Sequence, residues 1–467
     1  MKRIAYILLC LVVITSFAFA SESRLVGLSW FNLSEIEGTV KLFEDPFNFV
    51  YLPGYVNYDS NFVILEPQQG AGIFGNTYGV LKYSLNTPFD RINFGIVVNF
   101  PYNELSYIQL ISSGIPAIQI PAGVTPLQTF TILDHLRNKV DLVVGVGKIL
   151  GLSFLKPYAG VGYASDYSLS ISKQDDSGTN VSATTNQESI SQLKFSLGSI
   201  VDLSVISLDA GIKLYLPSAL NSTVVINKTT NNYLNTREHK TEGSFGFDIT
   251  VLPKIKFGNS YLLSLAEYFN YSLPSAQVRK LDANGDGTLE EDSRIDNNYQ
   301  VTRLNVGASY NTYINQFFIS FGGSLVNNNS YRTYKVISNI TTPNVTNEGY
   351  IQNSSISVPV FVSLEVPFAD WFVFRGGITR VIYQASYSLN RIGPEGNGTV
   401  TISDLSSPTT SFTTGFSIKP IKDLSVDWVV SFTFMNNVFV NGRLPWIISG
   451  NNLFDNVTQK FSIEYRM

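Results

Sequence analysis

The chain lacks most of the residues that soluble enzymes and nucleic-acid-binding proteins use. Among its 467 residues are one cysteine, Cys10, and two histidines. Charged residues make up 15% of the sequence, against about 25% in an average soluble domain. The formal net charge of −4 gives no electrostatic basis for binding nucleic acid. Beyond the N-terminus, no stretch approaches about 18 consecutive apolar residues, so the sequence predicts no transmembrane helix.

The N-terminus has the pattern of a secretory signal peptide. A basic start, MKR, precedes an apolar core, and the small-x-small sequence AFA at 18–20 follows it. We expect residues 1–20 to be removed after Ala20 and the protein to be exported. The apolar core is too short for a membrane anchor. Because Cys10 lies in this segment, the mature chain has no thiol chemistry and no disulfide.

Sequence patterns of hydrolytic active sites are missing. There is no H-E-x-x-H and no G-x-S-x-G. His135 follows Asp134 in LDHLRNK, and neighbours in sequence rarely point at one target. His239 lies in TREHK, where we expect a solvated histidine in a charged external loop. The sequence therefore predicts that the protein is not an enzyme and requires no cofactor.

What the chain has in abundance is strict alternation of apolar and polar residues. In DLSVDWVVSFTF (423–434), every second residue from Leu424 onward is apolar, and those between are polar except Val429. SFGFDITV, TRLNVGASY and SVPVFVSLEV repeat the pattern. Successive side chains of a strand point to opposite faces, so each segment predicts a strand with one apolar face.

The spacing of these segments predicts an all-β, transmembrane, antiparallel up-and-down β-barrel. Short links alternate with long polar segments, as in outer-membrane barrels. A soluble β-sandwich also alternates, but its strands are shorter than the ten residues or more expected here. We count fourteen strands; NFVILEP (61–67) and TYGVLKYSL (77–85) would raise the number to sixteen. The long polar segments lie near 173–188, 219–241, 280–297, 337–352, 390–407 and 438–457.

The barrel model divides the chain into three parts. Residues 1–20 are the signal peptide, 21–60 form a short plug or periplasmic lead-in, and 61–467 form the barrel. The chain ends on QKFSIEYRM (459–467), whose alternation predicts the closing strand. We expect membrane lipid around the barrel, and we expect the outer-membrane insertion machinery to read this last strand.

Four basic residues of the expected strands are candidates for the barrel lumen: Lys194, Arg303, Arg375 and Arg380. An ion-selective channel could use such side chains. The alternative, which we favour, is that they pair with Asp and Glu to fill the interior.

One segment, DANGDGTLEEDS (282–293), resembles a calcium-binding loop. It fits the D-x-[DN]-x-[DN]-G core, with alternate oxygen ligands and a glycine at the turn. Position twelve is Ser293 where a bidentate Glu is expected, so a neighbouring acid must replace it. The alternative is an acidic external loop without a metal. The candidate Ca²⁺ ligands are Asp282, Asn284, Asp286, Thr288 and Glu290.

Two stretches resemble the long-chain fatty-acid porin family of outer-membrane barrels. EDPFNFVYLPGYVN (44–57) is similar to that family's Asn-Pro-Ala-containing segment, and RINFGIVVNFPYN (91–103) to an early strand. The Asn-Pro-Ala triplet itself is not intact. The resemblance implies a signal peptide, a short N-terminal plug, a fourteen-stranded barrel and uptake of hydrophobic molecules. No binding residue can be carried over from it.

The sequence thus predicts a bacterial outer-membrane channel for passive passage of a small solute, which the resemblance suggests is hydrophobic. The alternative is a non-transporting barrel, structural or surface-binding, whose long Asn- and Thr-rich loops carry the function.

Overall fold

The computed structural model describes fifteen segments of the chain. The expected signal peptide, His135 and most of the candidate calcium loop lie outside them. The described residues are 41–43, 45–58, 61–67, 77–87, 91–100, 138–147, 152–175, 181–227, 232–281, 289–338, 344–392, 399–404, 410–421, 423–434 and 457–467.

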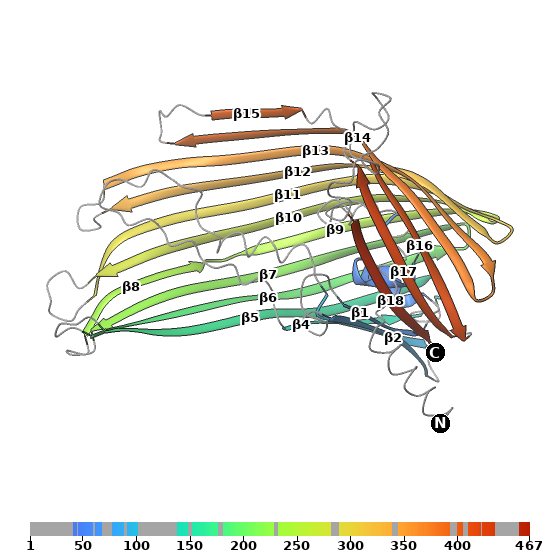
Figure 1. Cartoon of the computed structure of the whole chain (residues 1–467), viewed down its shortest axis with the longest axis horizontal. Coiled ribbons are helices and arrows are strands. Elements are labelled where there is room, and N and C mark those ends of the chain that lie inside the picture. The colour runs from blue at the N-terminus through green and yellow to red at the C-terminus, as the bar shows by residue number, and fades with distance from the viewer. Residues whose placement is uncertain are drawn as a thin grey trace, which may run out of the picture.

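Eighteen strands, all antiparallel to their neighbours, form one sheet (Figure 1). They are β1 (Phe62–Pro67), β2 (Thr77–Asn86), β3 (Arg91–Val98), β4 (Asn138–Val146), β5 (Leu155–Asp175), β6 (Val181–Leu203), β7 (Ile206–Asn227), β8 (Asn232–Thr241), β9 (Phe245–Phe257), β10 (Ser260–Leu281), β11 (Glu290–Ile314), β12 (Phe317–Ser338), β13 (Asn344–Ala369), β14 (Phe372–Ile392), β15 (Thr399–Asp404), β16 (Thr410–Ile421), β17 (Leu424–Phe434) and β18 (Val457–Arg466).

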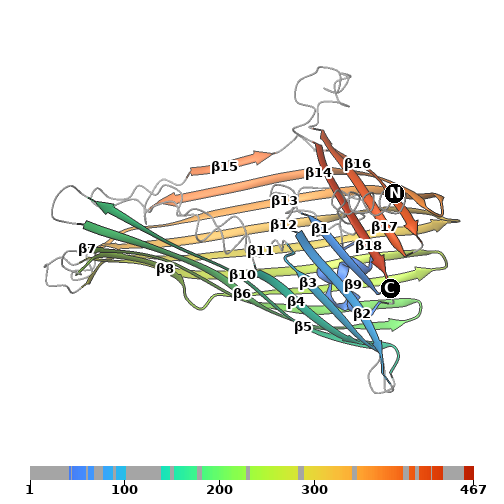
Figure 2. The ribbon, with the colours of Figure 1, turned by 60° about the horizontal axis from the view of Figure 1, so that its bottom comes forward.

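The sheet closes into a barrel because β1 pairs with both β2 and β18, beside which it lies in Figure 2. Two places in the barrel are each shared by two strands. β8 and β9 both lie between β7 and β10, and β15 and β16 both pair with β14. The barrel therefore has sixteen strand positions. The all-β barrel and the alternative count of sixteen are confirmed, and the main count of fourteen is wrong.

The two strands left out of the main count, β1 and β2, lack clear alternation for a physical reason. Phe62 and Ile64 on β1, and Tyr78 and Val80 on β2, face the lumen and are buried there. Both faces are therefore apolar at 62–65 and 78–81, although Glu66 and Lys82 also lie on the lumen face. A two-residue period is visible only where one face is polar.

Short turns join the strands at one end of the barrel. Two residues separate β6 from β7, β9 from β10, and β11 from β12. In each turn one residue has a positive φ: Ser204 (63°), Gly258 (59°) and Asn315 (57°). Two-residue hairpins require such angles to match the strand twist. We call this the short-turn end, and the opposite one the far end.

The outer face next to the short-turn end is apolar, while the lumen face carries polar side chains. Such a closed barrel with an apolar outer belt can span a bilayer, because closure of the sheet leaves no strand edge unpaired along its whole length. Exposed belt residues include Val161, Phe195, Leu197, Ile249, Leu304, Phe321, Val362 and Ile378. Buried polar residues on the lumen face include Asp141, Gln192, Asp248, Arg303, Ser320, Ser363, Arg375 and Asp427.

The strands β5 to β7 and β10 to β14 are much longer than the others and extend toward the far end (Figure 1). β11 has 25 residues and β13 has 26, against about 9–11 needed to cross a bilayer. Much of 280–297 and 337–352, expected to be loop, is therefore strand, and that expectation is wrong. Beyond the belt both faces are polar, so alternation disappears. The described residues contain no helix long and apolar enough to cross a membrane.

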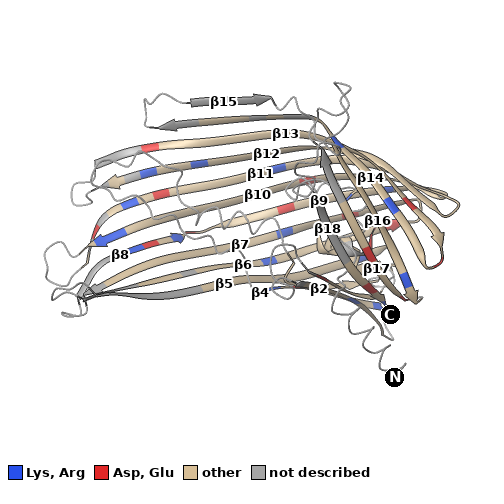
Figure 3. Ribbon diagram, viewed as in Figure 1, with Lys and Arg blue, Asp and Glu red and all other residues tan. Residues whose placement is uncertain are grey.

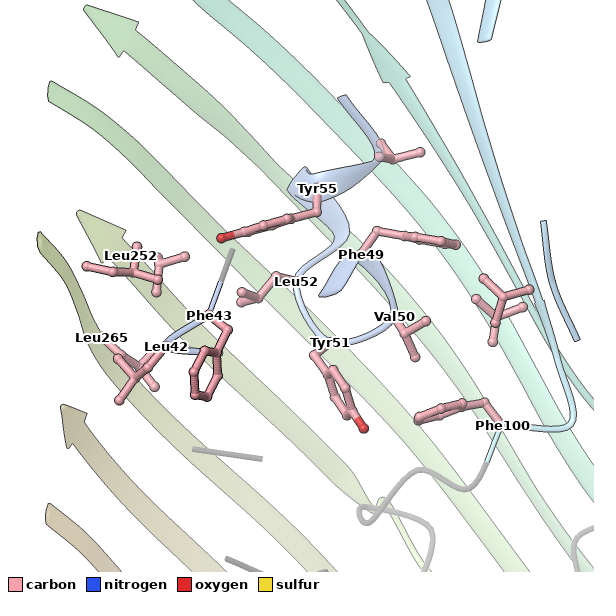
Figure 4. Packing of buried hydrophobic residues seen from close by; sticks show 14 of the residues in the cluster. Leu42, Phe43, Phe49, Val50, Tyr51, Leu52, Tyr55, Phe100, Leu252 and Leu265 are labelled. Carbon is pink, nitrogen blue, oxygen red and sulfur yellow. The ribbon is translucent and has the colours of Figure 1, made fainter. Parts of the chain in front are cut away.

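Residues 41–43 and 45–58, which we call the inner segment, lie inside the barrel (Figure 4). They fall within the expected N-terminal plug or lead-in (21–60). Two short 3₁₀ helices, η1 (Pro46–Val50) and η2 (Pro53–Asn57), make up most of the segment. Each helix begins with proline, whose fixed φ and missing N–H suit a first helical position.

Candidate functional site

The inner segment and the wall around it form one apolar core inside the barrel. Tyr55 and Val56 of η2 are 1% and 0% exposed, and Phe49 of η1 is 1% exposed. Figure 4 shows Tyr55 and Phe49 among the side chains that pack against the wall, with Leu252 and Leu265 beside Leu42 and Phe43. A sixteen-stranded barrel is too wide for wall side chains alone to fill. Here a separate piece of chain fills it.

Glycines in the wall make room for the inner segment. A Cβ atom on Gly95 of β3 would lie 2.6 Å from the Phe49 ring. On Gly145 of β4 it would lie 2.2 Å from Asn57 Oδ1 and 2.6 Å from Val56 Cγ1. Because real Cβ atoms do not approach other heavy atoms so closely, any side chain at these positions would displace the segment.

A buried ion cluster attaches the start of the inner segment to the wall. Lys41 Nζ donates to Glu267 Oε1 at 2.5 Å, and Arg303 Nη2 donates to the same oxygen at 3.2 Å. Asn305 Nδ2 donates to Glu267 Oε2 at 3.3 Å, and Ser309 Oγ donates to the Leu42 carbonyl at 2.6 Å. The Glu267 side chain is fully buried. Its charge is compensated only while these donors remain in place.

The end of the inner segment is held by amide hydrogen bonds. Asn57 Nδ2 donates to the carbonyls of Lys156 and Pro157, each at 3.1 Å. Asn57 Oδ1 accepts from Asn93 Nδ2 at 2.9 Å. Asn57 thereby connects η2 to β3 and β5. The inner segment is therefore anchored at both ends.

Three of the four basic residues considered for the lumen pair with acids inside the barrel, as the alternative that we favoured predicts. Arg380 is the exception. Arg303 pairs with Glu267, Lys194 with Asp141 at 2.7 Å, and Arg375 with one acid on the adjacent strand β13 and one on β17, two strands away. The Arg375 partners are Glu365, at 2.7 Å, and Asp427. Arg380 lies instead on the outer face, because it shares its side of β14 with the exposed Ile378 and Ile382.

Beyond the inner segment, the lumen wall carries a second apolar cluster, which we call the aromatic cluster. Tyr215 of β7 and Tyr271 of β10 have ring centroids 5.9 Å apart, and Phe269 stacks on Tyr271 at 5.7 Å. The Arg303 guanidinium lies over the Phe269 ring, 5.3 Å from its centroid. Tyr271 donates its hydroxyl hydrogen to Gln192 Oε1. This cluster separates the ion cluster at Glu267 from the far end.

His239 is not the solvated loop residue that the sequence suggested. It lies on the lumen face of β8, is 7% exposed, and its Nε2 is 3.1 Å from Ser275 Oγ. Burial, and then the nearby positive charge of Arg332, lower the pKa of His239 to about 4. The expectation failed because TREHKT is polar on both faces, so periodicity could not reveal a strand.

The His239 pKa leads to a test by titration. The unfolded chain would titrate this imidazole near its usual pKa of about 6.5. Protonation is disfavoured in the folded state, so the contribution of His239 to stability is greatest above pH 6.5 and falls as pH drops toward 4. We expect one histidine NMR signal to titrate near pH 4, and His239→Gln to remove that signal. A His239 signal that titrates near pH 6.5 would contradict the buried position.

The calcium prediction remains a prediction. Four of its five ligands, in 282–288, lie outside the described residues, and Glu290 is the first residue of β11. Within the described part of the chain, no group of three or more His, Cys, Asp or Glu side chains could hold a metal ion.

Comparisons with known proteins identify no family. No family model and no curated protein matches the chain. Several solved structures are similar over much of its length, among them the following three. The translocator domain of the autotransporter NalP from Neisseria meningitidis is 9% identical, covering 69% of this chain and 91% of its own, with a TM-score of 0.26. The Pseudomonas putida toluene transporter TodX is 11% identical, covering 90% and 92%, with a TM-score of 0.32. CdiB from Escherichia coli is 10% identical, covering 88% and 63%, with a TM-score of 0.35.

These TM-scores are all below 0.5, so function has to be argued from the residues of this chain. No family model supports the resemblance to the long-chain fatty-acid porins. The fourteen strands that this resemblance implied are wrong for this barrel.

Proposed function

We propose that the protein is a bacterial outer-membrane channel for passive passage of a small solute, with the inner segment as its constriction. The carrying observation is that residues 41–43 and 45–58 lie inside the barrel and pack with the wall as one buried apolar core. Barrels of this size enclose an aqueous channel unless something occupies it. The segment is not part of the sheet, so it can move without breaking a strand pairing of the barrel.

The location follows from three features taken together. The N-terminal pattern of a signal peptide predicts export, the barrel closes completely, and its outer belt is apolar. Closed barrels with short turns at one end and long extensions at the other are typical of the bacterial outer membrane. In this orientation the short-turn end faces the periplasm and the far end faces outside.

One observation favours the runner-up, a non-transporting envelope barrel. The inner segment shares a single apolar core with the wall and is anchored at both ends by buried polar contacts. A permanently filled barrel would have this appearance too. Conductance separates the two functions.

The test compares wild-type protein with Gly145→Val in planar bilayers. A valine at this position overlaps Val56 and Asn57 and should displace η2. We expect a low conductance from the wild type and a conductance several-fold higher from Gly145→Val. Gly376→Val is the matched control, because a Cβ there meets nothing closer than 3.7 Å.

Two outcomes would reject the proposal in different ways. If neither the wild type nor Gly145→Val conducts ions, and neither supports solute flux into liposomes, the barrel does not transport. If the wild type conducts as well as Gly145→Val, the protein is a channel but the inner segment is not its constriction.

A further inference from the structure

Four basic residues gather on one part of the lumen wall toward the far end. On neighbouring strands, Arg237 of β8 lies directly opposite Arg279 of β10, and His239 opposite Gln277. Two strands further, Arg332 of β12 faces the lumen opposite Tyr299. Figure 3 shows basic segments on β8, β10 and β12 toward this end of the long strands. We call Arg237, His239, Arg279 and Arg332 the basic wall.

The basic wall lies outside the apolar belt and past the aromatic cluster. No described side chain of β8 is among the large apolar residues exposed on the outer surface. On β10, Arg279 is six residues beyond Leu273, the last lumen-facing residue of that cluster on this strand. A solute that entered from the far end would meet the basic wall before the aromatic cluster and the inner segment.

On β8, β10, β11 and β12, charge is sorted by face toward the far end. On the outer face both signs occur and pair, as Arg294 does with Asp296 at 2.6 Å and Lys240 with Glu238 at 3.5 Å. On the lumen face of β8 (237–241), β10 (273–279), β11 (293–299) and β12 (332–338), the charged residues are bases alone. A surface evolved only for solubility would mix the signs on both faces.

Holding these bases together costs free energy. Like charges directly opposite each other on adjacent strands repel. Burial and then the charge of Arg279 lower the pKa of Arg237, and the charge of Arg332 contributes to the low pKa of His239. The register of β8 and β10 independently places Arg237 and Arg279 beside each other on the lumen wall. An anion bound among them would offset the repulsion.

We propose that Arg237, Arg279 and Arg332 form an oxyanion-binding site that recognises the carboxylate or phosphate group of a solute. The planar guanidinium fork matches both groups with paired hydrogen bonds. With a pKa near 4, His239 is neutral at pH 7 and adds a hydrogen-bonding group without a further charge. Lipid headgroups are excluded as ligands because the site faces the lumen and not the bilayer.

This inference rests on the proposed function, because it names the class of solute that the channel would carry. The binding test itself does not require transport. Purified full-length protein in detergent is titrated with inorganic phosphate and with benzoate by calorimetry. We expect binding of at least one, weakened about tenfold or more in Arg237→Gln/Arg279→Gln and in Arg332→Gln, because a charge-assisted contact is lost. Lys335→Gln and Arg294→Gln, on the outer face of β12 and β11, should bind as the wild type does.

Tighter binding of phosphate or of benzoate identifies the recognised group as a phosphate or a carboxylate. Either result supports the site. Wild-type protein that binds neither anion overturns the inference, as does equal affinity in Arg332→Gln and Lys335→Gln. Circular dichroism and gel migration of unheated samples show whether each variant has folded. Binding without solute flux would reject the proposed channel and leave this site standing. Flux without binding would reject the site alone.

Discussion

Deleting residues 459–467 is expected to prevent the protein from assembling in a membrane. These residues are most of β18, which forms nine residue pairs with β17 and four with β1. Without them, the edges of β1 and β17 would leave backbone N–H and C=O groups unpaired in hydrocarbon. Each such group costs several kcal/mol. An open sheet of this kind does not persist in a bilayer.

The readout is the fraction of protein that resists urea extraction from membranes and migrates as a compact band when unheated. Met467→Phe is the matched control. Met467 follows the end of β18, is 53% exposed, and uses only its backbone N–H, which donates to the Asn61 carbonyl at 3.1 Å. Phenylalanine keeps that bond. Normal assembly of the truncated chain would count against the closed barrel.

The second large effect is expected at the buried ion cluster. Glu267→Gln removes the charge and keeps the size of the side chain, so the ammonium of Lys41 and the guanidinium of Arg303 remain buried without their shared anion. Breaking a buried ion pair in this way costs about 3–5 kcal/mol. We expect the free energy of unfolding to fall by that amount, and the inner segment to become accessible to protease.

Urea unfolding in detergent micelles, followed by intrinsic fluorescence, measures the loss. Glu238→Gln provides a matched control, since Glu238 pairs with Lys240 on the exposed outer face. Exposed pairs contribute about 0–1 kcal/mol, so this variant should unfold like the wild type. If Glu267→Gln does the same, the cluster does not stabilise the inner segment.

The barrel could be predicted from sequence wherever a strand separates lipid from a polar lumen. β17 and β9 show this directly, with apolar residues such as Phe247 and Trp428 alternating with polar ones. The same reasoning failed at β1, where the lumen face is apolar because it packs on the inner segment. It failed again at the outer parts of β11 and β13, where water lies on both sides.

The candidate site was harder to predict than the fold, because it depends on contacts between distant parts of the chain. The expected pairing of Lys194, Arg303 and Arg375 with acids is confirmed, but a sequence cannot show that Lys41 shares Glu267 with Arg303. The opposition of Arg237 and Arg279 depends on strand register across the β7–β8 and β8–β10 pairs. Register is set by the whole barrel and not by local residue types.

The anchoring of the inner segment also constrains the order in which the protein can fold. Lys41 meets Glu267 and Leu42 meets Ser309, at sequence separations of 226 and 267 residues. Contacts that close loops this long form slowly, because the chain must lose much of its entropy first. The first described residues of the chain can therefore dock only after β10 and β11, far later in the sequence, have paired. We therefore expect the packing of the inner segment against the wall to be among the last steps of biogenesis.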